Sequence, residues 1–307
     1  MKYPLFKITI ECMTFNQSQY IGKTLDGFCI QQTEFPFVCC IIDDASTDGE
    51  QIVINTYLET HFDFSESSVS YTKETDYAKI IYAQHKVNKQ CFFMVLFLKE
   101  NHYSQKKSKT EYLKKFNEGI PYEAICEGDD YWIDPEKLSK QVSFLETHKE
   151  YGFTYARAYT CNEKDEISNK YIFGSNAETF NDIIARNTIP TLTTVYRKAL
   201  YSNYLKEIKR SDQWGMGDYP MWLYFILHSK VHFMNDIVGV YRVLPESASH
   251  SRSLKKKIKF VIGEYRVRLD MLKYANRKDL VFLAQKELIK GLVISIAYKI
   301  AILCRLK

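Results

Sequence analysis

The chain has 307 residues, of which 46% are hydrophobic and 26% charged, so it can bury a full core and has the composition of an ordinary globular protein. Its net charge of +5 is the small difference between 42 basic and 37 acidic residues, which argues against a nucleic-acid partner. The sequence contains no run of about 20 apolar residues, so a standard membrane-spanning helix is not expected.

The first half of the chain alternates strand and helix patterns. Apolar and β-branched runs predict strands at residues 6–12, 37–42, 91–98 and 122–126. Helical spacing predicts helices at residues 20–30, 52–57, 106–116 and, after a cap at Asp134, 135–145. Residues 63–90 are irregular, and we expect a surface loop with a short strand near Val69. This alternation predicts an α/β fold with a Rossmann-like, mostly parallel central sheet flanked by helices.

The second half is more varied. Strand patterns occur at residues 153–159, 191–196, 231–233 and 238–241, and helical patterns at 179–185 and 218–228. From residue 254 onward the pattern is helical, and lysines interrupt its apolar residues. Two interpretations of this tail stay open. It is either a helical pair that packs on the rest of the chain or an interfacial helix on an anionic membrane.

Three acidic residues, Glu127, Asp129 and Asp130, crowd together where the strand at 122–126 ends. Like charges this close repel each other unless a cation sits among them, and open α/β sheets bind ligands at this end of their strands. A solvated acidic turn before a helix would explain Asp134, but it explains the other three together less well. The stretch therefore predicts a divalent metal, Mn²⁺ or Mg²⁺, that holds a phosphorylated ligand.

Four other polar residues are candidates for binding or catalysis. Asp43 follows the strand at 37–42, where a carboxylate can accept a hydrogen bond from a nucleotide base or ribose, or cap the next helix. Asp218 opens a predicted helix and is either an ordinary cap or a general base. Arg242 and His250 could meet phosphate oxygens, although a lone histidine is more often structural.

Taken in order, these motifs resemble those of the family 2 glycosyltransferases, the inverting group with the GT-A fold, and in particular bacterial members of the polysaccharide and lipopolysaccharide type. The resemblance covers roughly residues 5–250, and the ordered set is far more specific than any single motif. The matching motifs are Thr14-Phe15-Asn16, Asp43-Asp44-Ala45-Ser46-Thr47-Asp48, Glu127-Gly128-Asp129-Asp130-Tyr131-Trp132, Asp134-Pro135-Glu136-Lys137-Leu138-Ser139-Lys140-Gln141, Gly217-Asp218 and Tyr241-Arg242.

The resemblance implies a catalytic domain at residues 1–250 and a C-terminal helical extension at 251–307. It also implies a role for several single residues. Thr14 and Asp43 would contact the nucleotide base, with Phe15 and Asn16 in the same donor-binding loop, Asp129 would contact the ribose or sugar, Asp130 would bind the metal, and Asp218 would deprotonate the acceptor hydroxyl. Three positions depart from the family pattern. Cys12-Met13 replaces the usual Pro, Phe15 replaces Tyr, and Gly217 replaces the Glu that often precedes the base.

The function expected from the resemblance is transfer of a sugar, with inversion, from a nucleotide-diphosphate donor such as a UDP-sugar. The acceptor would be a hydroxyl of a glycan or lipid-linked molecule in cell-surface polysaccharide synthesis. One alternative, a sugar-phosphate nucleotidyltransferase, would need a Gly-rich phosphate loop, but residues 11–17 contain no glycine. The other is a catalytically inactive sugar-binding homologue, against which the retained acidic residues argue.

Cysteine usage and the first residues indicate the compartment. The eight cysteines lack the paired spacing of zinc sites, and we expect buried, reduced thiols. Residues 1–4 do not begin an apolar signal region. We therefore expect a cytoplasmic protein. If the C-terminal helices bind membrane, it would lie peripherally on the inner face of the cell membrane.

Overall fold

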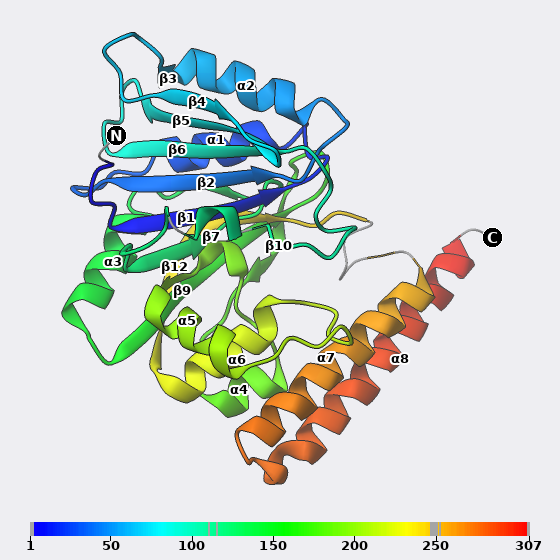
Figure 1. The fold of residues 1–307 in the computed structure, drawn as a ribbon. Helices are drawn as coiled ribbons and strands as arrows, with labels where there is room; N and C mark the ends of the chain where they lie inside the picture. Colours follow the sequence, from blue (N-terminus) through cyan, green and yellow to red (C-terminus); the bar gives the residue numbers. More distant parts are fainter. Residues whose placement is uncertain (1–2, 110, 115, 246–250, 252, 306–307) are drawn as a thin grey trace.

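The computed structural model describes residues 3–305 except for 110, 115, 246–250 and 252. A sheet of 12 strands runs through the molecule (Figure 1). Its strands are β1 (Ile8–Thr14), β2 (Phe37–Asp43), β3 (Phe62–Asp63), β4 (Tyr71–Glu74), β5 (Ala78–His85), β6 (Cys91–Leu98), β7 (Tyr122–Ile125), β8 (Tyr131–Trp132), β9 (Tyr151–Cys161), β10 (Ile167–Phe173), β11 (Val195–Arg197) and β12 (Lys230–Arg242).

Eight α-helices and three short 3₁₀ turns are described around this sheet. The helices are α1 (Ile21–Cys29), α2 (Glu50–His61), α3 (Lys137–Thr147), α4 (Phe180–Ala185), α5 (Lys198–Glu207), α6 (Asp218–His228), α7 (Leu254–Tyr274) and α8 (Val281–Arg305), and the turns are η1 (Glu111–Leu113), η2 (Thr191–Thr193) and η3 (Lys278–Leu280). Within the described residues, none of these helices is both long and apolar enough to cross a membrane.

The centre of the sheet is parallel and covered on both faces. Strands β6, β2, β1 and β7 lie side by side in parallel, and in this register Thr14 is opposite Asp43. Every residue of β2 is buried, as expected for a continuous apolar strand between two layers. Apolar residues of α1, α2 and α3 pack on one face of these strands. The carboxyl ends of β1, β2 and β7 therefore meet at one edge, which is where the acidic motifs lie.

Several predicted elements differ in the structure. Residues 63–90 hold β4 and β5, which pair antiparallel with each other and extend the sheet beyond β6, in place of the expected surface loop. Between residues 106 and 116 the described part contains η1 in place of a full helix. The strand patterns at 231–233 and 238–241 form the single strand β12, because register shifts keep it paired with β9.

Two predicted boundaries also move. The pattern at 191–196 divides into η2 and β11. The helix expected at Pro135 begins at Lys137, because the Pro135 carbonyl accepts a hydrogen bond from Gln32 N and the Asp134 carboxylate accepts one from Glu136 N.

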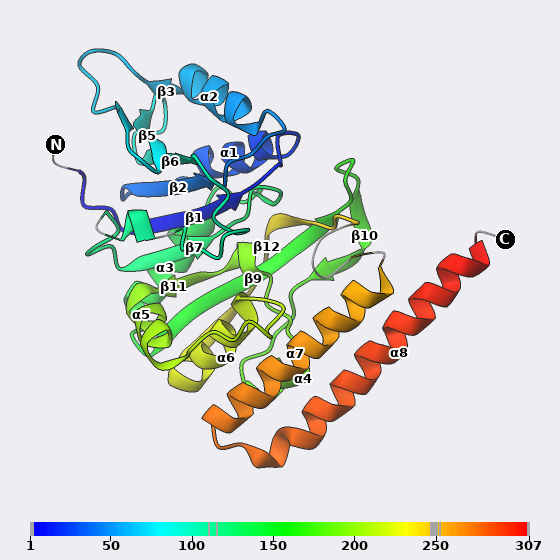
Figure 2. The same cartoon turned by 45° about the vertical axis from the view of Figure 1, so that its right-hand side comes forward.

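A second hydrophobic cluster holds the later helices together. Residues of α4, α5 and α6 pack on β9 and β11, with Trp222 fully buried among them. Val267 and Met271 of α7 and Ala284 of α8 belong to the same cluster. The pair α7–α8 is antiparallel and extends away from the sheet, with α8 on the outer side (Figure 2). The C-terminal helices therefore pack on the domain along part of their length, while the division at residue 250 stays a prediction.

Candidate functional site

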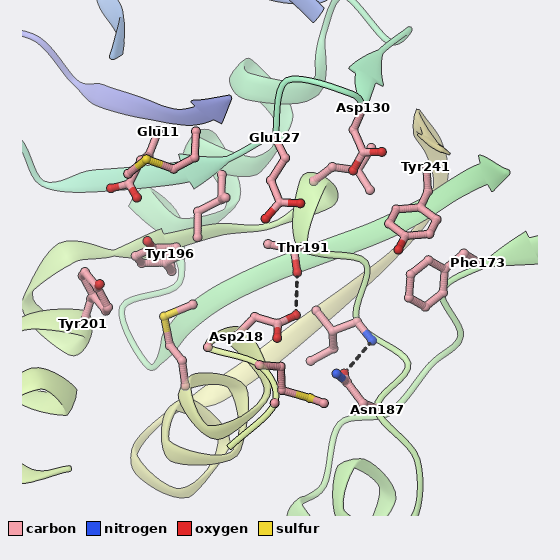
Figure 3. A pocket seen from close by; sticks show the side chains of 18 of the residues that line it. Glu11, Glu127, Asp130, Phe173, Asn187, Thr191, Tyr196, Tyr201, Asp218 and Tyr241 are labelled. Atoms are coloured by element: carbon pink, nitrogen blue, oxygen red, sulfur yellow. Dashed lines mark hydrogen bonds between the residues drawn. The ribbon is translucent and has the colours of Figure 1, made fainter. Parts of the chain in front are cut away.

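A cavity of about 780 Å³ lies where the carboxyl end of β7 faces the start of α6. Glu127 and Asp130 enter it from the loop after β7, Thr191 from η2, and Asp218 from the first residue of α6 (Figure 3). Phe260 and Glu264 of α7 also line the cavity. The cavity thus unites the acidic motif with Asp218, which lies about 90 residues later in the sequence.

The acidic loop is seated on the end of β1 and on α1. Gly128 N donates a hydrogen bond to the Met13 carbonyl over 3.1 Å. The Thr24 hydroxyl lies 2.9 Å from the carbonyl oxygen of Gly128 and 2.7 Å from that of Asp130. A Cβ at Gly128 would come within 2.6 Å of the Thr14 Cβ, so only glycine allows this approach. The loop is therefore fixed by its backbone, and Glu127 and Asp130 of this loop line the cavity.

Arg242 holds the same loop from the other side. Its backbone N donates to Asp130 Oδ1 over 2.8 Å, and its Nε donates to the Asp129 carbonyl over 2.9 Å. The remaining guanidinium nitrogens bond Asn162 O at 3.0 Å and Asp165 Oδ1 at 2.5 Å. We expected Arg242 to meet phosphate oxygens, but its side chain has no exposed surface and is surrounded by these protein acceptors. The geometry makes it a positioning residue for the acidic loop.

Burial and mutual repulsion disfavour charge on the loop carboxylates. Burial, followed by the charge of Asp129, raises the pKa of Asp130 well above its usual value. Burial, followed by the charges of Asp129 and Asp218, raises the pKa of Glu127 to about 7. Figure 3 shows the Glu127 carboxylate directed toward Thr191 and Asp218. A cation placed here would reverse these effects, because it stabilises the charged carboxylates.

The carboxylates suit a divalent metal that keeps most of its coordination sites for a ligand. Mg²⁺ and Mn²⁺ prefer oxygen, and Mg²⁺ sites often use one or two carboxylates plus substrate phosphates. Asp130 lines the cavity, and Arg242 N donates a hydrogen bond to Asp130 Oδ1. This bond orients the Asp130 carboxylate, which is therefore suited to bind a metal. Among the residues that the structure describes, no three His, Cys, Asp or Glu side chains converge into a metal cluster of their own.

Asp43 carries an unsatisfied acceptor at the end of β2. The residue is fully buried, and its Oδ1 accepts hydrogen bonds from Ser46 N at 3.2 Å and Gln51 Nε2 at 2.5 Å. Its Oδ2 is buried and bonds no residue that the structure describes. Burial raises the pKa of Asp43, while the hydrogen bonds from Ser46 and Gln51 lower it. An unpaired buried carboxylate oxygen is costly, so this atom is suited to a ligand donor.

The donor-binding loop that we predicted after β1 is organised by Glu50, which sequence reasoning missed. The Thr14 hydroxyl donates to Glu50 Oε1, and Gln17 N and Ser46 Oγ each donate to Oε2 over 2.9 Å. Thr14 is thereby buried against Glu50. Glu50 is the first residue of α2, and an acidic residue in the first turn was the available signal.

The remaining residues of this loop face solvent. Phe15 is 43% exposed, and Asn16 adopts a positive φ of 53° while its Oδ1 accepts a hydrogen bond from Thr47 N at 2.8 Å. Asp44, beside Asp43 in the same motif, instead holds the loop after β6. It accepts hydrogen bonds from His102 N and Tyr103 N and pairs with Lys109. Of the two adjacent aspartates, only Asp43 has an oxygen that bonds none of the residues described.

Asp218 is held by a hydroxyl from η2. Thr191 Oγ1 donates to Asp218 Oδ2 over 2.8 Å (Figure 3). Tyr219 N donates to Asp218 Oδ1 over the same distance. Gly217 occupies the cap position, so Asp218 is the first residue of the helix, and its carboxylate bonds one backbone N–H of the first turn. The carboxylate therefore bonds both η2 and the start of α6, and Asp218 lines the cavity.

The η2 turn that carries Thr191 is itself clamped by buried side chains. Trp132 Nε1 donates to the Leu192 carbonyl at 2.7 Å, and Gln141 Nε2 donates to the Thr193 carbonyl at 2.8 Å. Lys137 Nζ lies 3.5 Å from the Thr194 carbonyl, and burial lowers the pKa of this lysine to about 7. The motif at residues 134–141 thus fixes the turn that holds Asp218, a role that the sequence motif did not reveal.

The inner end of the cavity contains a second acidic pair that we did not predict. Glu11 lines the cavity with Glu123, which accepts a hydrogen bond from Tyr196 and lies 3.6 Å from Lys198 Nζ. Burial, followed by the charge of Glu123, raises the pKa of Glu11 to about 8. A charged residue within a β1 sequence that otherwise favours burial was the signal. His250, the last predicted site residue, lies outside the described residues.

Comparisons with known proteins bear on the fold. No protein-family model matches the chain. Uncharacterized proteins of Mycobacterium bovis and Mycobacterium tuberculosis are 31% identical over 193 residues, which are 62% of this chain and 47% of theirs. The chain therefore spans about half the length of these curated relatives.

Solved structures resemble nearly the whole chain. S. aureus TarS matches with a TM-score of 0.50 and 17% identity, and the match covers 95% of this chain and 49% of TarS. Residues 1–349 of TarS in complex with UDP-GlcNAc match with a TM-score of 0.52 and 14% identity, covering 95% of this chain and 81% of that one. The mannosyltransferase PcManGT from Pyrobaculum calidifontis, in complex with GDP-Man and Mn²⁺, matches with a TM-score of 0.55 and 13% identity. This match covers 97% of this chain and 74% of that one. At such identities the likeness concerns the fold. The expected fold class is confirmed: the chain has the GT-A fold of glycosyltransferases, with a mostly parallel central sheet flanked by helices and a C-terminal helical pair.

Proposed function

We propose that the protein is an inverting, metal-assisted glycosyltransferase that moves a sugar from a nucleotide-diphosphate donor to an acceptor hydroxyl. One observation carries the proposal: a single cavity on a GT-A fold joins the crowded carboxylates after β7 to Asp218, which Thr191 orients. The acceptor class is a glycan or lipid-linked molecule of cell-surface polysaccharide synthesis, and UDP-sugars are the first donors to test.

The donor lies along the carboxyl ends of β1, β2 and β7. Asp43 Oδ2 accepts a hydrogen bond from the base or ribose, since it has no partner within the described residues. Phe15 and Asn16 belong to the loop after β1, where Asn16 bonds Ser46 and Thr47 of the Asp43 loop, and we assign Asp129 to the ribose or sugar. The similar structures support this donor class, because their ligands are UDP-GlcNAc, UDP and GDP-Man.

Asp130 is the residue that would hold the cation. When bound, a divalent metal neutralises negative charge that develops on the departing diphosphate. Arg242 keeps Asp130 in place through its backbone N–H, and it fixes the neighbouring Asp129 carbonyl through its Nε. The acidic loop therefore reaches the donor with its geometry already set.

Asp218 is the general base. It takes the proton of the acceptor hydroxyl as that oxygen attacks the anomeric carbon from the face opposite the diphosphate. This single displacement inverts the anomeric centre, by the stereochemical logic of inverting glycosidases. The Thr191 hydroxyl donates to Oδ2, which fixes the direction of the carboxylate while further lone pairs stay available.

The test is incubation with a panel of nucleotide sugars and Mn²⁺, followed by measurement of free nucleotide. We expect release with one donor class, its loss after chelation of the metal, and its loss in Asp130→Asn. Asp218→Asn should abolish transfer while donor binding, measured by calorimetry, persists. Pyrophosphate formation from a nucleoside triphosphate and a sugar phosphate would instead identify a nucleotidyltransferase, and binding without any turnover an inactive homologue.

A further inference from the structure

The outer face of α8 carries a continuous apolar stripe. The helix packs on α7 and, near its start, on α4, with Ala284 and Ser295 on its buried side. On the opposite side large apolar residues are 48–76% exposed. We call these residues the outer stripe: Phe282, Ile289, Val293, Ile296 and Ile300. Their spacing of seven, four, three and four residues places them on one helical face.

Positive charge borders this stripe. At 100° per residue, Lys286 and Lys290 fall on one flank of the outer stripe and Lys299 on the other. Glu287 is the only acidic residue in the α8 sequence, and it lies 3.5 Å from Lys290 Nζ. The basic start of α7 adjoins the second half of α8, because Lys257 Nζ sits 3.3 Å from the ring centroid of Tyr298.

This charge pattern decides between two occupants of the stripe. A second copy of the chain would bring lysine flanks against lysine flanks, without the acidic partners that such helix pairs use. An anionic lipid surface complements the lysines, whose long stems let the ammonium groups reach the headgroups while the stripe enters the acyl boundary. The pattern is that of a helix lying in a membrane interface.

We propose that the α7–α8 pair seats the protein on an anionic membrane through the outer stripe and its flanking lysines. The other side of α7 contributes Phe260 and Glu264 to the wall of the cavity, so one helix pair adjoins both the lipid and the candidate active site. A lipid-linked acceptor would thereby reach Asp218 from the membrane side. That second step rests on the proposed function, whereas the membrane contact itself does not.

The experiment is cosedimentation of the full chain with vesicles of phosphatidylglycerol and phosphatidylcholine in equal parts, compared with phosphatidylcholine alone. We expect binding to the anionic vesicles that weakens with salt. Lys286→Gln and Lys290→Gln should each lower the partition coefficient by about fivefold, since a lysine near an anionic surface contributes about 1 kcal/mol. Ile289→Ser and Ile296→Ser should each lower it by about tenfold.

Matched controls are Ile52→Ser, at an apolar α2 residue that is 72% exposed, and Lys149→Gln, at an exposed lysine after α3; both should bind like the unaltered chain. The proposal is overturned if the unaltered chain ignores anionic vesicles, if the stripe variants bind them equally well, or if the stripe instead forms a dimer that Ile289→Ser dissociates. Nucleotide release without vesicles is measured in parallel. Stripe variants that keep this release separate a failed membrane contact from a failed proposed function.

Discussion

Replacing Gly128 by alanine tests whether the acidic loop must sit against the end of β1. The added methyl group would lie 2.6 Å from the Thr14 Cβ and 2.5 Å from Gln17 Oε1. Carbon atoms prefer about 3.5–4.0 Å, so either the loop or the end of β1 must shift by about 1 Å. Thr14 is anchored to Glu50, and Met13 and Thr24 hold the loop backbone, so neither side can yield freely.

Two magnitudes follow from this clash. Overpacking a well-filled site costs about 1–3 kcal/mol, which should lower the unfolding midpoint by a few degrees. A shift of about 1 Å in Asp129 and Asp130 should lower the rate of nucleotide release by about 100-fold, because catalysis depends steeply on such placement. The loss of activity should therefore exceed what the loss of folded protein explains.

Gly22 in α1 provides the matched control, because a Cβ there would meet nothing within 4 Å. Gly22→Ala should leave activity unchanged and hold or raise the unfolding midpoint, since alanine favours a helix by about 0.5–1 kcal/mol. Steady-state release with the preferred donor and thermal unfolding, run on both variants, give the comparison. If Gly128→Ala kept activity within about threefold of the unaltered chain, the close approach would not matter and the reasoning would be refuted.

Three further changes address other contacts of the cavity. Thr191→Val should lower kcat by about tenfold with little change in donor KM, because the carboxylate of Asp218 loses its donor, and Thr191→Ser should restore the rate; an unchanged kcat would remove Thr191 from the mechanism. Gln141→Leu should cost about 1–3 kcal/mol in chemical denaturation, because it leaves the Thr193 carbonyl without this donor; a neutral result would show that the turn stands without it. Burial raises the pKa of Glu11 from 4.5 to about 8. Between these two pH values the folded chain keeps the Glu11 proton while the unfolded chain loses it, so the free energy of unfolding falls as the pH rises from 4.5 to about 8. Glu11→Gln should flatten this slope in unfolding midpoints measured from pH 4.5 to 8, and parallel slopes would contradict the assignment.

The sequence predicted the features that depend on local pattern. Continuous apolar runs located β2 and β6 correctly, because strands buried on both faces need apolar residues throughout. The order of the motifs along the chain was sufficient to indicate the GT-A fold, and Asp130 and Asp218 do lie at one cavity. Their chemical roles stay predictions.

What the sequence did not predict depends on contacts between distant segments. Residues 71–85 are mixed in polarity. They form β5, whose backbone is satisfied by pairing with β6, and β4, which pairs with β5. Arg242 was expected at phosphate oxygens, yet Asp165 and two carbonyls enclose its guanidinium. The sequence gives no signal that Glu50 binds Thr14 and Gln17, which lie 36 and 33 positions away, or that Gln141 binds Thr154 and Thr193, which lie 13 and 52 positions away.

Under the proposed function, the hydrogen bonding of η2 has a consequence for the redesign of acceptor choice. The Leu192 and Thr193 carbonyls are committed to buried side chains of the β8–α3 segment. Reshaping this turn would therefore loosen Thr191, which holds Asp218. Residues of other elements also line the cavity, including Tyr201 and Tyr204 of α5 and Phe260 of α7. Libraries aimed at new acceptors should therefore vary α5 and α7 and leave the turn untouched.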